Sequence, residues 1–241
     1  MLQSTRGLVF YVARYSDSSG LIKIFTEEAG LQSCIVKSLY SRNAKLKPAL
    51  FGHLSLLDLI IDYKPGRPIQ YIRDASINRF YHEITDNIAR TSVLLFINEL
   101  LYKAIKEEEA NPTLFEFIEY TLESLNDNEI PVNSFHLLFL IRLLDHLGFG
   151  PTYSLESTGA YFDLLTGMPV SDDSGHSHII SGDLLKLLRQ MSHMDYNDLG
   201  NYVIPRKARF ELLNTLLDFL RIHIPEMAEL KSIKVLHEIL A

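Results

Sequence analysis

The spacing of hydrophobic residues divides the chain into two parts with different periods. In the first 80 residues, apolar and aromatic side chains form short runs separated by turn-forming clusters, as is typical of β-strands. Alternation is clearest where Leu57, Leu59 and Ile61 fall on one face. The predicted strands are Thr5–Tyr15, Leu21–Thr26, Leu31–Tyr40, Ser55–Tyr63 and Ile69–Ala75. Five short strands fit a small closed barrel, because closure removes exposed edges.

After Phe80 the hydrophobic period changes from two to about 3.6 residues, which predicts helices. The segment 88–106 places Val93, Ile97, Leu100 and their neighbours on one stripe. The segment 135–147 is hydrophobic nearly all round, as expected of a helix buried between others. The segment 205–224 places Phe210, Leu213, Leu217, Leu220 and Ile224 on one stripe at 3–4 spacing. The predicted helices are Ile88–Lys106, Thr113–Leu125, Phe135–Leu147, Asp183–Met194, Pro205–Ile224 and Leu230–Leu240.

Residues 148–181 follow neither period. They are rich in Gly, Ser and Asp, and inside them Ala160–Val170 resembles a short hairpin with a turn near Thr166 and Gly167. The chain is therefore predicted to be an α+β protein with two domains. Residues 1–80 form the barrel, and residues 81–241 form a helical domain with an irregular or hairpin insertion at about 148–181.

Charge is distributed unevenly between the two predicted domains. Residues 1–80 carry 11 Lys and Arg against 6 Asp and Glu, whereas residues 81–241 carry 12 against 24. The net charge of −7 is the sum of a basic barrel and an acidic helical domain. The barrel can still bind a polyanion, because screening limits the reach of each charge to roughly 10 Å. A chance distribution of charge over two solvated surfaces is the alternative.

Catalytic and metal-binding signatures are weak. Cys34 lies within an apolar strand, where cysteine is most often an inert small hydrophobe, and a single cysteine excludes a disulfide framework. No phosphate loop, dinucleotide fingerprint or nucleophile elbow is present. His176 and His178 lie near two carboxylates, so a metal-dependent hydrolase is a remote alternative to a solvated polar loop. We predict no enzyme activity, no metal and no cofactor.

The most informative feature is a basic loop in the predicted barrel. No Asp or Glu falls between Glu28 and Asp58, so its cations are not offset locally. Cations on a loop suit phosphate contacts, and the nearby tyrosines could stack bases of a single strand. A solvated loop explains the charges equally well. The predicted phosphate contacts are Lys37, Arg42, Lys45 and Lys47, followed by Lys23, Arg67 and Arg73.

A second cluster of cations opens the long helix after Pro205. Arg206, Lys207 and Arg209 fall in its first turn, where they oppose the helix dipole but join the unsatisfied N–H groups to form a place for an anion. We expect this turn to hold phosphate or an acidic peptide. A tolerated surface cost is the alternative.

Together these stretches resemble the bacterial RecO family of recombination mediators in DNA repair. The similarity covers nearly the whole chain. It rests on the order of Thr5-Arg-Gly-Leu-Val, Tyr15-Ser-Asp, Gly30-Leu-Gln-Ser, Lys45-Leu-Lys-Pro-Ala49 and the end Arg209-Phe-Glu-Leu-Leu with Leu230-Lys-Ser-Ile-Lys-Val-Leu236.

The resemblance implies an OB fold that binds single- and double-stranded DNA and promotes strand annealing. It also implies partnership with RecR and with the single-stranded-DNA-binding protein, whose acidic tail suits the turn after Pro205, in support of RecA loading. Many members carry four zinc-binding cysteines in the insertion, but residues 148–181 contain none. We expect Tyr161, Phe162, Leu164 and Leu165 to hold the hairpin by packing instead.

A rival hypothesis keeps the same fold but gives it another role. The barrel would bind a peptide and not DNA, and the helical domain would serve as a partner surface in a protein-interaction scaffold. No apolar run reaches the roughly 20 residues that span a bilayer, and no secretory signal is visible. We therefore expect a cytoplasmic, nucleoid-associated protein that does not enter membranes.

Overall fold

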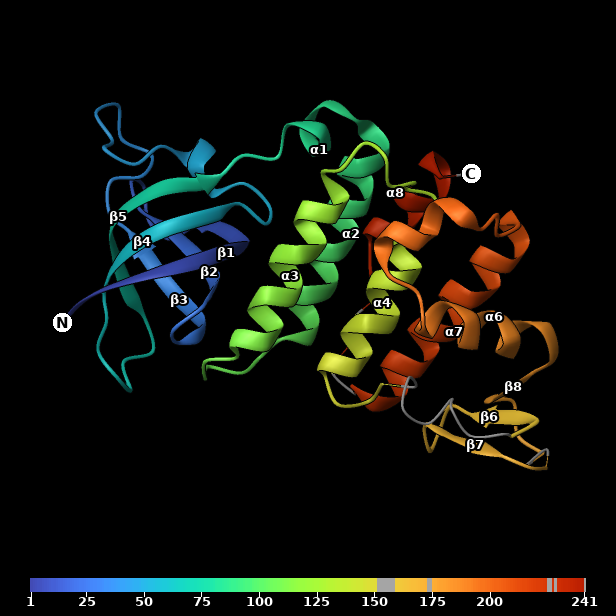
Figure 1. The fold of residues 1–241 in the computed structure, drawn as a ribbon. Helices are drawn as coiled ribbons and strands as arrows, with labels where there is room; N and C mark the ends of the chain where they lie inside the picture. The colour runs from blue at the N-terminus through green and yellow to red at the C-terminus, as the bar shows by residue number, and fades with distance from the viewer. Residues whose placement is uncertain (151–158, 173–174, 225–226, 228, 241) are drawn as a thin grey trace. The chain divides into compact units, whose positions relative to one another are not determined.

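The computed structural model describes residues 1–150, 159–172, 175–224, 227 and 229–240 (Figure 1). The chain forms two compact units. The first contains residues 1–87 and 94–123, and the second contains residues 88–93 and 124–241. The strand-rich part ends at Arg79, and the unit that holds the barrel also includes the helical residues 82–86, 94–104 and 112–123.

A closed five-stranded barrel occupies the first 80 residues, as predicted. Its strands are β1 (Leu2–Arg14), β2 (Gly20–Thr26), β3 (Gly30–Val36), β4 (Leu56–Asp62) and β5 (Gln70–Arg79). They are joined in the order β1-β2-β3-β5-β4, and β4 pairs with β1 to close the ring. The pairing of β3 with β5 is parallel, and the other pairings are antiparallel.

The largest differences from the predicted strands are at the ends of β3 and β5, and both have identifiable reasons. β3 stops at Val36, four residues before the predicted end, because Ser38 takes a positive φ of 57° and turns the chain. β5 continues beyond Ala75 to Arg79, because its pairing with β4 continues across two irregularities. The extension of β5 depends on a strand that is distant in sequence, which the local pattern does not show.

The barrel interior is filled by alternating side chains, including the predicted Leu57, Leu59 and Ile61. Cys34 belongs to this core and is 0% exposed, as predicted for an inert cysteine. Burial raises the pKa of its thiol to about 12, so the reactive thiolate is not formed at neutral pH.

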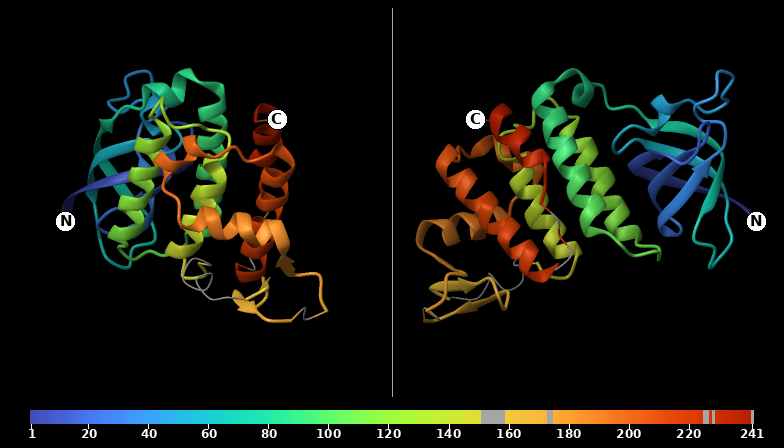
Figure 2. Two further views of the ribbon diagram at one scale, coloured as in Figure 1. Left: turned by 45° about the vertical axis from the view of Figure 1, so that its right-hand side comes forward. Right: turned by 180° about the vertical axis from the view of Figure 1, so that it is seen from behind.

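Two helical segments cover the outside of the barrel within the first unit. They are residues 94–104 of α2 (Ile88–Ala104) and 112–123 of α3 (Pro112–Leu125), which lie side by side next to the strands (Figure 2). The predicted stripe of α2 is buried throughout its length. Outward-facing Phe25 of β2 contacts Phe10 at 5.8 Å and Phe115 of α3 at 6.0 Å between ring centroids. The five-residue α1 (His82–Asp86) was not predicted, because it is too short to show a period.

The second unit is mainly helical and contains α4 (Phe135–His146), α6 (Gly182–Ser192), α7 (Arg206–His223) and α8 (Ser232–Ile239). Nine of the 12 residues of α4 are buried, which confirms the prediction of a helix enclosed by others. One predicted stripe position is wrong: Phe210 of α7 is 51% exposed. Within the described residues, no helix is both long and apolar enough to cross a membrane.

The predicted hairpin is present and belongs to a three-stranded sheet. β6 (Tyr161–Asp163) pairs with β7 (Met168–Val170) on one side and with the unpredicted β8 (Ile179–Ser181) on the other. Phe162 and Leu164 are buried as expected. Leu165 is 45% exposed, contrary to expectation, because the Asp163 carboxylate accepts its backbone N–H and turns the chain outward.

Candidate nucleic-acid interface

Two cations and a tyrosine meet where β3 and β5 run in parallel. The register pairs Ile35 with Tyr71, and Lys37 follows two residues later, which brings it toward the same outer face. The Lys37 ammonium and the Arg67 guanidinium each lie 5.3 Å from the centroid of the half-buried Tyr71 ring. An aromatic ring with two cations over it presents both groups that bind a single strand: a stacking surface and charges for phosphate.

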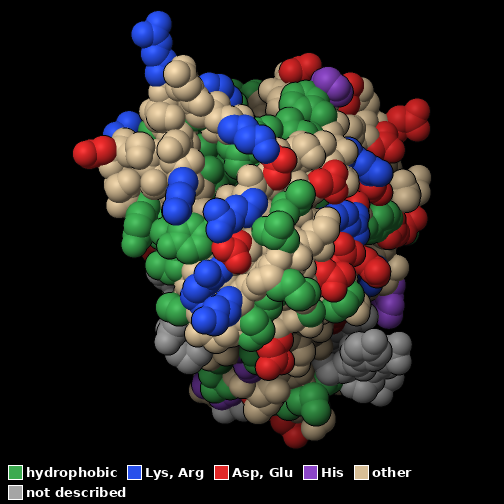
Figure 3. Space-filling view, turned by 90° about the vertical axis from the view of Figure 1, so that its left-hand side faces the viewer, with side chains coloured by type: hydrophobic (Ala, Val, Ile, Leu, Met, Phe, Trp, Pro, Cys, Tyr) green, Lys and Arg blue, Asp and Glu red, His purple; other side chains and the backbone are tan. Residues whose placement is uncertain are grey.

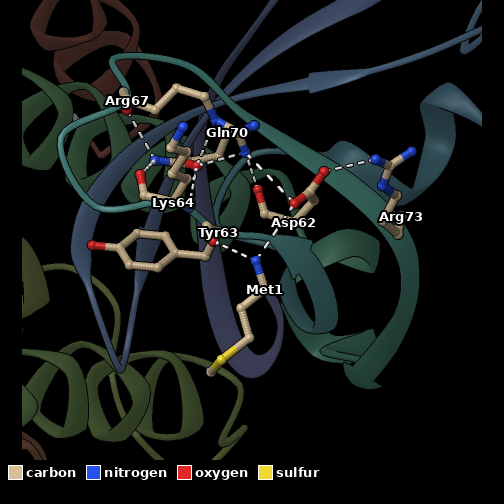
Figure 4. A network of polar contacts seen from close by, with 7 residues as sticks. All are labelled: Met1, Asp62, Tyr63, Lys64, Arg67, Gln70 and Arg73. Carbon is tan, nitrogen blue, oxygen red and sulfur yellow. Dashed lines mark hydrogen bonds and ion pairs between the residues drawn. The ribbon is translucent and has the colours of Figure 1, made fainter.

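Arg67 is held in place by the loop that joins β4 to β5 (Figure 4). Gln70 is only 2% exposed, and its side-chain amide donates to the Lys64 and Arg67 carbonyls at 3.1 and 2.9 Å. Its carbonyl oxygen accepts from the Lys64 backbone N–H at 3.0 Å and from the Arg67 guanidinium at 2.9 Å. One buried side chain therefore fixes the shape of this loop and the direction of its arginine.

Asp62 at the end of β4 is the acidic centre of the same network. It pairs with Arg73 at 2.7 Å and with Arg67 at 3.9 Å (Figure 4). The hydrogen bond from Arg73 lowers the pKa of the Asp62 carboxyl, so it is ionised at neutral pH. Arg73, one of the predicted phosphate contacts, is thus oriented by a carboxylate.

The basic loop between β3 and β4 has buried anchors and exposed cations. Leu39, Leu46 and Phe51 belong to the barrel core, whereas Arg42, Lys45 and Lys47 are exposed. Lys45 pairs with Asp74 of β5 at 2.8 Å. An ion pair this exposed contributes little to stability, so Lys45 can exchange Asp74 for a phosphate at low cost.

The predicted cations do not all fall in one place. Lys23 lies on β2, where it is paired with Tyr11 of β1 on one side and with Ser33 of β3 on the other. The Tyr11 ring stacks on the Tyr102 ring of α2, with 5.1 Å between centroids, so Tyr11 packs against a helix within the first unit. Sequence reasoning missed Arg14, whose guanidinium lies 4.7 Å from the Tyr40 ring centroid. Arg14 and Tyr40 are far apart in the sequence, so only the folded structure reveals this pair.

The barrel side of the molecule presents Lys and Arg side chains with hydrophobic side chains between them (Figure 3). We name the group around Tyr71 and the loop after β3 the barrel patch. It comprises Lys37, Tyr40, Arg42, Lys45, Lys47, Arg67, Tyr71 and Arg73, with Arg14 beside Tyr40. Its chemistry suits a flexible polyanion that carries flat bases.

The three cations at the start of α7 divide between two roles. The helix begins at Arg206, one residue after the predicted start at Pro205, and Arg206 and Lys207 are exposed. Arg209 is half-buried and donates to the Ile204 carbonyl at 3.0 Å and to the Leu240 carbonyl at 3.2 Å. It therefore ties the start of α7 to the end of α8.

A cavity of about 300 Å³ opens beside these arginines within the second unit. Its lining includes Arg206, Arg209, His136 and His237 together with the Phe210 ring, and none of the described lining residues is Asp or Glu. Burial and the nearby arginines lower the pKa of both histidines. A cavity with two fixed cations and an aromatic wall fits an anion attached to an apolar group. Lys207 does not line it.

The histidines of the insertion belong to the second unit and do not line the α7 cavity. His176 Nε2 is 3.6 Å from Asp163 Oδ1, and the rings of His176 and His178 are 6.2 Å apart. Asp173, part of the motif considered above, falls outside the described residues. Among the residues that the structure describes, no three His, Cys, Asp or Glu side chains are grouped to hold a metal ion.

The fold and its surface define a class: a barrel protein of the OB type with an appended helical domain. A family profile described as Recombination protein O N terminal matches residues 1–81, and one described as Recombination protein O C terminal matches residues 85–232. The chain therefore belongs to the RecO family of DNA repair and recombination proteins.

Individual relatives support the same assignment over full length. The chain is 32% identical to the DNA repair protein RecO of Bacteroides fragilis over 99% of each protein. It is 30% identical to the protein of that name from Phocaeicola vulgatus and 28% identical to the one from Azobacteroides pseudotrichonymphae, again over 99% of each.

Proposed function

We propose that this protein is a DNA-binding recombination mediator that acts without catalysing a covalent step. Its barrel binds single- and double-stranded DNA and promotes annealing of complementary strands. With RecR it helps to load RecA onto strands coated by the single-stranded-DNA-binding protein. These events take place in the cytoplasm at the nucleoid. Membership of the RecO family supports the repair role, and the barrel patch supports DNA as the ligand.

The observation that carries this proposal is the arrangement of cations around Tyr71. Lys37 follows β3 and Arg67 lies in the loop between β4 and β5, and both lie 5.3 Å from the same ring centroid. The loop with Arg42, Lys45 and Lys47 adds three exposed charges. A phosphate backbone crossing the loop can place a base near Tyr71, so both strands of an annealing reaction can be held by charge and stacking.

Replacing Arg42, Lys45 and Lys47 together by alanine tests the proposal. Because these three cations then no longer neutralise phosphates, affinity for a labelled single strand is expected to fall roughly 10- to 50-fold at physiological salt. The log–log dependence of affinity on salt becomes less steep by about 2. Fluorescence anisotropy with one oligonucleotide over a range of salt concentrations measures both quantities. The thermal midpoint should barely move, because all three side chains are exposed.

The matched control removes three exposed cations from the second unit. Lys186, Arg221 and Lys234 are replaced by alanine; the first two form surface ion pairs, as Lys45 does. The net charge changes equally, but the barrel is untouched. Equal loss of affinity in both triple variants would show that DNA responds only to total charge, and the barrel patch would then not be its binding site.

We further propose that the α7 cavity takes the acidic tail of the single-stranded-DNA-binding protein. The cavity combines Arg206 and Arg209 with Phe210 and apolar side chains of α7 and α8, which suits a tail ending in carboxylates and aromatic groups. DNA phosphate is the competing ligand for the same arginines.

Arg206→Glu is expected to weaken binding of a tail peptide by about tenfold or more, because it removes one fixed cation and adds repulsion. Lys207→Glu, which changes the charge equally outside the cavity, should have a much smaller effect. Anisotropy of a labelled tail peptide and of a labelled oligonucleotide is compared for both variants. Retained peptide binding together with lost DNA binding in Arg206→Glu would assign the cavity to DNA.

A further inference from the structure

A second groove lies on the other side of the start of α7, and its chemistry is opposite. It has a volume of about 520 Å³ and lies within the second unit. Its lining includes Leu184, Leu187 and Ala208 as apolar surface and the carboxylates of Asp183 and Glu211, and no Lys or Arg is among its described residues. The cavity with Arg206 and this groove lie on two sides of the start of α7, and they therefore suit ligands of opposite charge.

The sequence of α6 explains why this groove is apolar. Leu185 and Leu188 are buried against the core, whereas Leu184 and Leu187 are only half-buried and line the groove. The helix thus carries apolar side chains on two faces, and only one face is packed within the protein. The second face is left for a ligand.

An extended segment forms one wall of the groove. Tyr202 has φ −131° and ψ 127°, and Pro205 favours an extended conformation at the residue before it. Tyr202 directly follows the 3₁₀ helix Tyr196–Asn201, and among the described residues the backbone N–H and C=O groups of Val203 form no hydrogen bonds. Tyr202 is 46% exposed and Val203 is 97% exposed. An apolar, unpaired and extended segment is the edge to which a peptide can add as a strand.

We infer that this groove binds an extended peptide segment of a partner protein, pairing with Tyr202 and Val203 and directing apolar side chains onto Leu184 and Leu187. Lys or Arg side chains of the peptide meet Glu211 and Asp183. This interaction is independent of DNA binding by the barrel and of the cavity that contains Arg206. The partner is recognised by alternating apolar and basic residues, which matches the apolar groove and its acidic rim.

The probe is a labelled peptide that alternates Val with Lys, compared with the same peptide in which Glu replaces Lys. The Lys peptide is expected to bind one site per chain, and the Glu peptide is not. Glu211→Lys should weaken the Lys peptide roughly tenfold or more. Val203→Ser should also weaken it; this side chain is 97% exposed, so the variant keeps the fold.

Two controls separate the groove from general attraction to an acidic unit. Glu238→Lys on α8 makes the same charge change outside the groove and should leave affinity unchanged. A Lys peptide with N-methyl groups on alternate amides cannot form the strand pairing and should bind poorly. Equal weakening by Glu238→Lys, or undiminished binding of the methylated peptide, would overturn the inference. So would self-association of the wild-type chain that Val203→Ser abolishes, since a second copy would then occupy the groove.

Discussion

Gly30→Ala is expected to lower the free energy of unfolding by about 3 kcal/mol, although it adds one methyl group. Gly30 has a φ of +63°, which an L-residue adopts only with strain. A Cβ built there lies 2.2 Å from the backbone carbonyl oxygen of Glu109, in the loop between α2 and α3. That loop is fixed nearby, because the Leu31 N–H donates to the Glu107 carbonyl at 2.9 Å. Urea denaturation followed by circular dichroism measures the loss.

Gly66→Ala is the matched control for this prediction. Gly66 has a φ of +73°, but no atom lies within 4 Å of its added Cβ, so only the backbone strain of about 1 kcal/mol is expected. The difference between the two variants therefore measures the clash with the 107–109 segment. Equal losses would mean that the loop yields freely and does not brace the barrel.

Acid is expected to destabilise the protein through His136, which is 4% exposed on α4. Burial, and after it the charges of Arg209 and His237, lowers the pKa of this histidine to about 3. An unfolded histidine titrates near 6.5, so between these values the unfolded state binds the additional proton. The free energy of unfolding then falls as the pH falls, by up to about 1.4 kcal/mol per pH unit. Stability is fully retained above pH 6.5 and declines below it.

His136→Leu removes this titration, so the comparison concerns slopes and not absolute stability. Between pH 6.5 and 4.5 the wild type should lose about 2 to 3 kcal/mol more than the variant. His193→Leu, at an exposed position, should keep the wild-type slope. Parallel slopes for the wild type and His136→Leu would contradict a neutral buried imidazole. Denaturant titrations at several pH values give the free energies.

The elements that could be predicted from the sequence are those long enough to show a hydrophobic period. Alternation in 1–80 located five strands, and the inward set at Leu57, Leu59 and Ile61 is the barrel core. The 3.6-residue period located the longer helices, because a buried face imposes a pattern on every turn. Elements of three to five residues, such as β8 and α1, are too short to carry any period.

The arrangement of the barrel patch could not be predicted from sequence. Lys37 and Arg67 are predicted phosphate contacts and Tyr71 is one of several nearby tyrosines, but their meeting depends on the parallel pairing of β3 with β5. The acidic partners Asp62 and Asp74 decide which cations are oriented by an ion pair. Such pairs form between strands, and a residue's neighbours along the chain do not reveal them.

The cations at Pro205 show the same limit in the second unit. Their place in the first turn of a helix followed from local signals. Which of the three cations can share a ligand depends on packing. Arg206 and Arg209 line a cavity together with side chains of α4 and α8, whereas Lys207 does not line it. Phe210 was assigned to the buried stripe by its spacing, but it lines the cavity and is 51% exposed. An apolar residue at a core position of the pattern can therefore serve a binding surface.

Photo-crosslinking of a thiothymidine-containing single strand to the full chain, followed by mass spectrometry of the linked peptides, tests the central claim most directly. The barrel patch predicts crosslinks at Tyr71 and in the segment 37–47, which disappear when unlabelled single-stranded DNA competes. High salt should reduce them, because phosphate contacts hold the strand in place. Crosslinks confined to residues 124–241, with none in the barrel, would contradict the assignment of DNA binding to this surface.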